Sequence, residues 1–90
     1  MTKGMILGER KQPENGDLLL KETEYGINPK DGQWYARPPG CQTGGLKRHT
    51  VTEHEDGTIT VKPSILVEYA TKTSNVSWHG YLENGSWREC

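Results

Sequence analysis

Two side chains in the C-terminal half have the types that nucleophilic catalysis needs. Ser64 follows Pro63 at the start of an apolar segment, and His79 lies 15 residues later in a second such segment. A serine hydroxyl is a weak nucleophile unless an imidazole takes up its proton, so the two must come within hydrogen-bond reach. The alternative is that Ser64 bonds to backbone at a strand entry and that His79 is an ordinary surface histidine. The candidates for a third group that orients the imidazole are Glu68, Glu53 and Asp56.

Whether Ser64 and His79 can meet depends on the register of the strands that carry them. Side chains alternate between the two faces of a strand. If Ala70 pairs with Val76, the two side chains project from opposite faces of the sheet. If Ala70 pairs with Asn75, they share a face one diagonal step apart, about 7–8 Å between Cα atoms. A slip of one residue separates the two outcomes, and both remain open at this point.

A loop of unusual composition precedes these strands. Residues Arg37–Gly45 contain two prolines, which lack a backbone donor, and three glycines, which tolerate positive φ. We predict an irregular segment whose backbone can approach another group closely. For a hydrolase, the amides of Gly44 and Gly45 are our candidate donors to an oxyanion.

The aromatic residues admit two interpretations. Tryptophan and tyrosine usually build the core of a small domain, and alternation places Trp78 on the core face and His79 on the opposite face. An exposed aromatic patch would instead bind a protein partner, since these residues dominate interface energetics. The residues predicted for such a binding face are Trp78, Tyr81 and Trp87.

The elements that must position all these residues are β-strands. No window longer than ten residues has helical periodicity, whereas short apolar runs alternate with Gly, Asn, Asp and Pro. Glu55–Gly57 between two alternating runs predicts a hairpin, and Asn84–Gly85 predicts a second. We expect a mostly β fold, a small antiparallel sheet folded as a sandwich or open barrel. Asp31–Ala36 predicts a turn that leads into a strand. The clearer strands, in the C-terminal half, are His49–Glu53, Thr58–Lys62, Ser64–Tyr69, Val76–Leu82 and Ser86–Glu89.

Composition limits the classes of function. Ninety residues form one domain, 1–90, with residues 1–30 expected to be partly mobile and 31–90 to form the β core. The net charge is −1 with mixed signs, which disfavours nucleic-acid binding. No apolar run reaches membrane-spanning length and no secretion signal is evident, so we expect a cytoplasmic protein without membrane contact. Its oligomeric state is open.

Cofactors and metals are not expected. The two cysteines are too few for a disulfide framework, and thiols are expected in a reducing compartment. No tight ligand spacing such as Cys-X-X-Cys occurs, so we predict no metal site. The residues of suitable type are Cys41, His49, His54, His79 and Cys90.

The segments Pro63–Val67 and Trp78–Gly85 together resemble the paired motif of a small bacterial and phage family. Its members carry a Pro-Ser-(Ile/Leu) strand and then a His-containing strand that ends in an Asp/Asn-Gly turn. Some lie beside ubiquitin-like conjugation genes and are interpreted as serine peptidases that act on the ubiquitin-like protein. The likeness covers residues Gly57–Trp87.

By this resemblance Ser64 matches the nucleophile and His79 the base. The chain departs from the family pattern in two respects. Trp78 stands where cysteine is common, and the cysteine-rich segment of many members is missing. The resemblance therefore implies a candidate pair of residues in a phage or mobile-element protein.

Two hypotheses of different class follow. The first is a minimal serine hydrolase of peptidase type, with a protein substrate, Ser64 as nucleophile and His79 as general base. The second is a non-catalytic protein-binding or inhibitory module that uses its Trp and Tyr face. The distance from the Ser64 hydroxyl to the His79 ring discriminates between them most directly.

Overall fold

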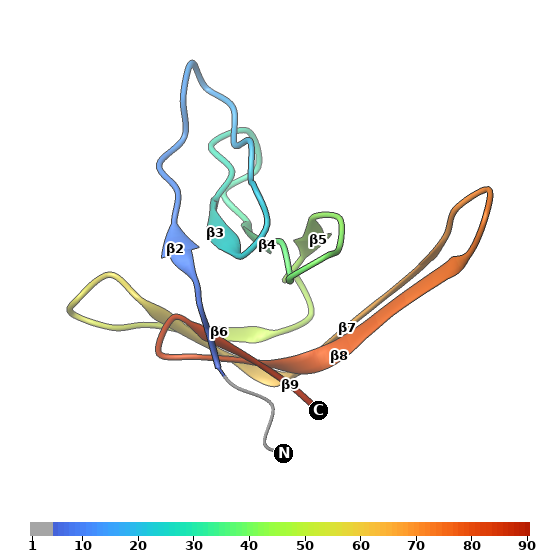
Figure 1. Ribbon diagram of the computed structural model, residues 1–90. Helices are drawn as coiled ribbons and strands as arrows, with labels where there is room; N and C mark the ends of the chain where they lie inside the picture. Colours follow the sequence, from blue (N-terminus) through green and yellow to red (C-terminus); the bar gives the residue numbers. More distant parts are fainter. Residues whose placement is uncertain (1–4) are drawn as a thin grey trace.

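The computed structural model describes residues 5–90, and these form two β-sheets without a helix (Figure 1). The larger sheet contains β1 (Ile6–Leu7), β6 (Thr50–Glu53), β7 (Ile59–Ala70), β8 (Asn75–Glu83) and β9 (Ser86–Glu89). The smaller sheet contains β2 (Glu9–Arg10), β3 (Glu24–Ile27), β4 (Trp34–Ala36) and β5 (Gly44–Gly45). The smaller sheet lies over one face of the larger one, which confirms the predicted mostly β fold. We call the other face of the larger sheet its outer face.

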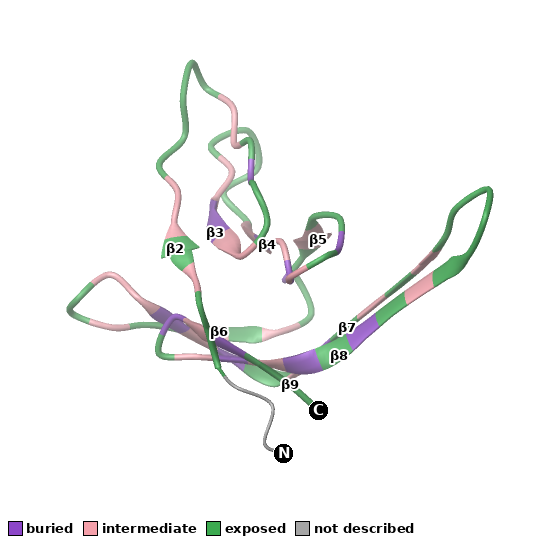
Figure 2. Cartoon of the chain, viewed as in Figure 1, coloured by how far each residue is buried: buried purple, intermediate pink, exposed green. Residues whose placement is uncertain are grey.

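The larger sheet is antiparallel, with the strand order β1-β9-β8-β7-β6. Three consecutive hairpins build most of it. The first turns at Gly57 (φ +88°), as the sequence predicted, and it pairs Glu53 with Ile59. The last turns at Asn84 and Gly85, which was also predicted, and both residues have positive φ. The middle hairpin, β7–β8, extends away from the body to an exposed tip (Figure 2).

The structure differs from the predicted strands at Pro63. We expected two strands separated there, but β7 is continuous across it. Its pairing with β8 shifts register between Val61 and Ile65. Proline cannot donate to a ladder, so the strand accommodates it with a bulge. The sequence therefore predicted the position of the irregularity correctly, but the irregularity is a bulge within one strand and not a boundary between two strands.

The core is formed between the two sheets. Trp78 and Trp87 are only 6% and 1% exposed and pack edge to face, with ring centroids 5.4 Å apart. The buried Trp87 indole donates its N–H to the Thr23 carbonyl at 2.9 Å, so burial leaves that polar group paired. The buried cluster also contains Tyr25, Ala36, Cys41, Leu46, Ile59, Val61, Ile65 and Leu82.

The core extends further toward the N-terminus than predicted. Tyr25, on β3, is 1% exposed, although the β core was expected to begin at residue 31. Strand β3 was not anticipated, because its four residues include a glycine and lack clear alternation. Residues 1–4 of the predicted domain lie outside the described part. No helix in residues 5–90 has the length and apolarity to cross a membrane.

Candidate functional site

The structure brings Ser64 and His79 together on the outer face of the larger sheet. The Ser64 hydroxyl oxygen lies 2.8 Å from His79 Nε2. Leu66 pairs with His79, so Ser64 is one diagonal step away on the same face. Of the two registers that the sequence left open, this is the one that permits a dyad.

A tight turn at the tip of the β7–β8 hairpin sets that register. Ala70 pairs with Asn75, which leaves four residues in the connection. The Thr71 amide donates to the Ser74 carbonyl at 2.7 Å, and the Thr71 hydroxyl accepts from the Ser74 amide at 3.0 Å. These short-range bonds close the turn and hold the strands in one alignment.

The backbone at Ser64 is held from the other side by a residue that the sequence did not single out for this role. His49 Nε2 lies 3.2 Å from the Ser64 carbonyl oxygen, which can only accept, so the ring nitrogen donates. His49 Nδ1 is buried and has no hydrogen-bond partner in residues 5–90. Because His49 precedes β6, only the tertiary structure reveals its contact with β7.

The His79 ring is exposed, but the backbone of β8 around it is closely packed. Its carbonyl accepts from the Cys90 amide at 2.8 Å. On the buried face, a Cβ added to Gly80 would come within 2.6 Å of the Trp78 ring and 2.3 Å of the Arg88 carbonyl. The absent side chain of Gly80 therefore makes room for the Trp78 indole directly behind His79.

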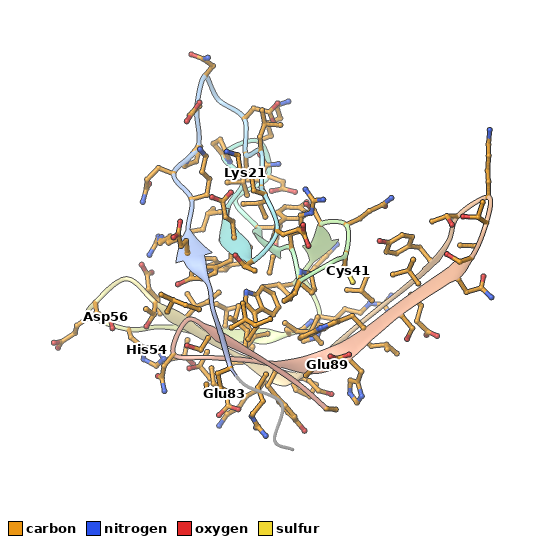
Figure 3. The ribbon with its side chains drawn as sticks, in the orientation of Figure 1. Lys21, Cys41, His54, Asp56, Glu83 and Glu89 are labelled. Carbon is orange, nitrogen blue, oxygen red and sulfur yellow. The ribbon has the colours of Figure 1, made fainter. Side chains whose placement is uncertain are left out.

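The structure does not place any of the three candidate carboxylates, Glu53, Asp56 or Glu68, as a third residue of the dyad. Glu53 pairs with Arg10, and Asp56 accepts from the Thr58 hydroxyl at 2.6 Å at the β6–β7 tip (Figure 3). Hydrogen bonds from Thr58 hold the pKa of Asp56 below its usual value. Glu68 lies on the outer face opposite Ser77. In residues 5–90, none of these three carboxylates hydrogen-bonds to His79.

A shallow groove of about 590 Å³ opens beside Ser64. Arg88 lies over the Tyr81 ring, 4.8 Å from its centroid, and bonds Glu83 at 2.7 Å. The bond to Glu83 raises the pKa of Arg88. Lys62 adds a second cation to this part of the outer face, so the groove offers both aromatic and charged contacts. The lining residues are Thr60, Val61, Lys62, Pro63, Ser64, Tyr81, Glu83 and Arg88.

Gly44 and Gly45 are not brought to Ser64. They form β5 in the smaller sheet, so part of the loop is regular structure, contrary to expectation. A Cβ on Gly44 would contact the Val67 side chain at 3.6 Å. Val67 and Ser64 project from opposite faces of β7, so in this arrangement the two glycine amides cannot donate to an oxyanion at Ser64.

The predicted aromatic binding face does not form as a unit. Trp78 and Trp87 are core residues, so only Tyr81 of the three is partly exposed, on the outer face. The alternation that placed Trp78 in the core is confirmed. Within residues 5–90, no three His, Cys, Asp or Glu side chains lie close enough together to hold a metal ion.

Comparison with known proteins gives no assignment for this site. No protein-family model matches the chain, and no curated protein or solved structure matches it significantly.

Proposed function

We propose that the protein is a minimal serine hydrolase of peptidase type in which Ser64 is the nucleophile and His79 the general base. The observation that carries the proposal is the 2.8 Å separation between the Ser64 hydroxyl and His79 Nε2. That distance lies within the range for direct proton transfer between a nucleophile and its base. The adjacent groove supplies space for an acyl substrate on the solvent side of the pair.

The chemistry follows from the positions of the two atoms. Ser64 Oγ attacks a carbonyl carbon while its proton passes to His79 Nε2, giving a tetrahedral adduct. His79 then returns the proton to the leaving amine or alkoxide, and the carbon–leaving-group bond breaks to give an acyl-Ser64 ester. Water, deprotonated by His79, attacks the ester and releases the acid, and the proton returns to Ser64 Oγ. No group is consumed other than substrate and water.

The dyad is expected to be a slow catalyst. In the serine proteases, a carboxylate that fixes the tautomer of the imidazole raises kcat by about 10⁴-fold. None of the candidate carboxylates reaches His79. We therefore expect reaction with activated acyl and phosphonyl groups to be easier to detect than turnover of an ordinary peptide.

Labelling with a fluorophosphonate probe, followed by intact-mass spectrometry, tests the proposal. Wild-type protein should gain one adduct at Ser64, and Ser64→Ala should gain none. His79→Ala should slow labelling by about 10²–10⁴-fold, the usual contribution of a general base. Ser77→Ala is the matched control, since Ser77 is an exposed serine on the same face of β8 and should not affect the rate. Labelling that survives Ser64→Ala, or its absence from the wild type, would contradict the proposal.

A second candidate is a protein-binding module without turnover. It is favoured by Leu66, which is 57% exposed and lies directly opposite His79 on the outer face. An exposed leucine on the same face as the partly exposed Tyr81 suits an interface with a protein. An unlabelled wild type that still binds a protein through this face would support the second candidate. The family likeness of the two motifs supports, under either candidate, an origin in a phage or mobile element.

A further inference from the structure

In the described part of the chain, residues 5–90, one edge of β7 has no neighbouring strand beside the dyad. Strand β7 runs from Ile59 to Ala70, but β6 pairs only with its first four residues, Ile59–Lys62. Beyond Lys62, the residues that the structure describes (5–90) place β8 on one side of β7 and no strand on the other. The open edge therefore begins at the bulge and passes Ser64 toward the hairpin tip. An open edge of this kind can pair with another chain.

The direction of the free backbone groups follows from a hydrogen bond on the far side of β8. The Cys90 amide donates to the His79 carbonyl, so the backbone of His79 faces away from β7. His79 and Leu66 thus form a non-hydrogen-bonded pair, and the N–H and C=O of Leu66 point to the open edge. By the same alternation, Glu68 presents its N–H and C=O there about 6.8 Å further along.

Within residues 5–90, the first position of this row, Ser64, is the one that accepts a hydrogen bond from elsewhere in the protein. The Ser64 carbonyl already accepts from His49, the residue that directly precedes β6. In residues 5–90, the backbone N–H and C=O groups of Leu66 and Glu68 make no hydrogen bond with a group outside the β-strands. The edge thus presents two donors and two acceptors, spaced as in a β-ladder, next to the nucleophile.

We propose that the substrate is a polypeptide bound in extended conformation, as an added strand along β7 at Leu66 and Glu68. This inference rests on the proposed function for the cleavage step, whereas strand addition is testable by itself. An added strand would lie about 4.8 Å from β7, in line with β6. The main chain of the added strand would pair with the edge whatever its amino-acid sequence. Its side chains would alternate between the two faces of the larger sheet. The exposed Leu66 side chain offers an apolar contact on the outer face.

This geometry selects an extended polypeptide over a small acyl ester. A small ester needs only Ser64, His79 and the groove. A row of alternating donors and acceptors with a strand's repeat is complementary to another strand and is not used by a compact ligand. The hydrolase would then hold a flexible segment of a protein substrate, with the bond to be cleaved near Ser64.

Proline substitution at Glu68 tests strand addition directly. Glu68→Pro removes an N–H that points to the open edge and leaves the ladder with β8 intact. Glu68→Ala removes the same side chain but keeps the N–H, so the difference between the variants isolates the backbone donor. Lys72→Pro, in the exposed turn at the hairpin tip, is the control for introducing proline into this arm. All are made in a Ser64→Ala background, which separates binding from cleavage.

Binding is measured by fluorescence anisotropy with fluorescein-labelled, carboxymethylated casein as the unfolded probe. Glu68→Pro should bind about tenfold or more weakly than Glu68→Ala, because one main-chain bond is lost and the ring crowds the added strand. Lys72→Pro should bind like the Ser64→Ala parent. In the parent, amide exchange at Leu66 and Glu68 should slow when the probe binds.

Three results would overturn the inference. The first is equal affinity of Glu68→Pro and Glu68→Ala. The second is that probe binding slows amide hydrogen exchange at other residues but not at Leu66 and Glu68. The third is a dimer of the free protein that Glu68→Pro dissociates and that does not bind casein, since the occupant would then be a second copy. If Ser64 is never phosphonylated but the Glu68 variants behave as expected, the hydrolase proposal fails while strand addition stands.

Discussion

His49 Nε2 donates to the carbonyl oxygen of Ser64 at 3.2 Å, so one histidine holds the backbone of the residue whose hydroxyl bonds a second histidine. The two contacts lie on different sides of the same strand. His49 contacts the Ser64 carbonyl and not the hydroxyl, so under the proposed mechanism it would be a positioning residue. The bulge at Pro63 is the irregular part of β7 that this contact holds in place.

Removing the His49 ring should reduce Ser64 reactivity more than it reduces stability. His49→Ala loses one hydrogen bond, which should lower the free energy of unfolding by about 1 kcal/mol. Phosphonylation of Ser64 should slow by about tenfold, because a small displacement of the nucleophile is costly. His49→Gln retains an N–H donor and should recover part of the rate. Urea unfolding measures the free energy of unfolding, and labelling kinetics measure the reactivity of Ser64. An unchanged labelling rate in His49→Ala would refute the positioning role.

Gly80 should tolerate no side chain. Gly80→Ala places a Cβ 2.3 Å from the Arg88 carbonyl and 2.6 Å from the Trp78 ring. Relief of these overlaps must move β9 or the indole, so we expect a loss of about 1–3 kcal/mol in unfolding free energy. Gly44→Ala is the control, since its Cβ would meet only ordinary contacts. Equal unfolding midpoints for the two variants would contradict the packing described behind His79.

Trp78→Ala should nearly unfold the protein. The side chain is 6% exposed, and its loss leaves a large cavity in a small core. The expected destabilisation is about 3–5 kcal/mol, comparable to the whole stability of a small domain. Leu19→Ala, at a 70% exposed leucine, should change stability by less than about 0.5 kcal/mol. Thermal unfolding followed by circular dichroism would measure both, and a mild Trp78→Ala phenotype would place the core elsewhere.

Acid should weaken the β6–β7 hairpin through Asp56. Hydrogen bonds from Thr58 lower the pKa of Asp56 in the folded state below the ordinary value of 3.8. Its contribution to stability is therefore complete above the unfolded pKa and is lost as pH falls through the folded pKa. Asp56→Asn lacks the titrating group, so its stability should fall less steeply below pH 3.8 than that of the wild type. Chemical denaturation at pH 6 and at pH 3 tests this, and parallel losses in the two proteins would refute it.

Several local features of this protein could be predicted from its sequence. Turn residues with positive φ marked the hairpins at Gly57 and Gly85, and alternation placed Trp78 in the core. Such signals depend on neighbours in the chain, so short-range rules are enough to detect them. The residue types of Ser64 and His79 likewise identified a candidate pair.

Only the tertiary structure decided whether the two side chains of that pair lie within hydrogen-bond distance. A strand has a side-chain period of two, so the four-residue connection at Thr71–Ser74 determines whether Ser64 and His79 share a face. Long-range packing also carried Gly44 to the opposite side of β7 and brought His49 to the Ser64 carbonyl. These contacts join segments distant in sequence, and their energies depend on packing that no local pattern contains.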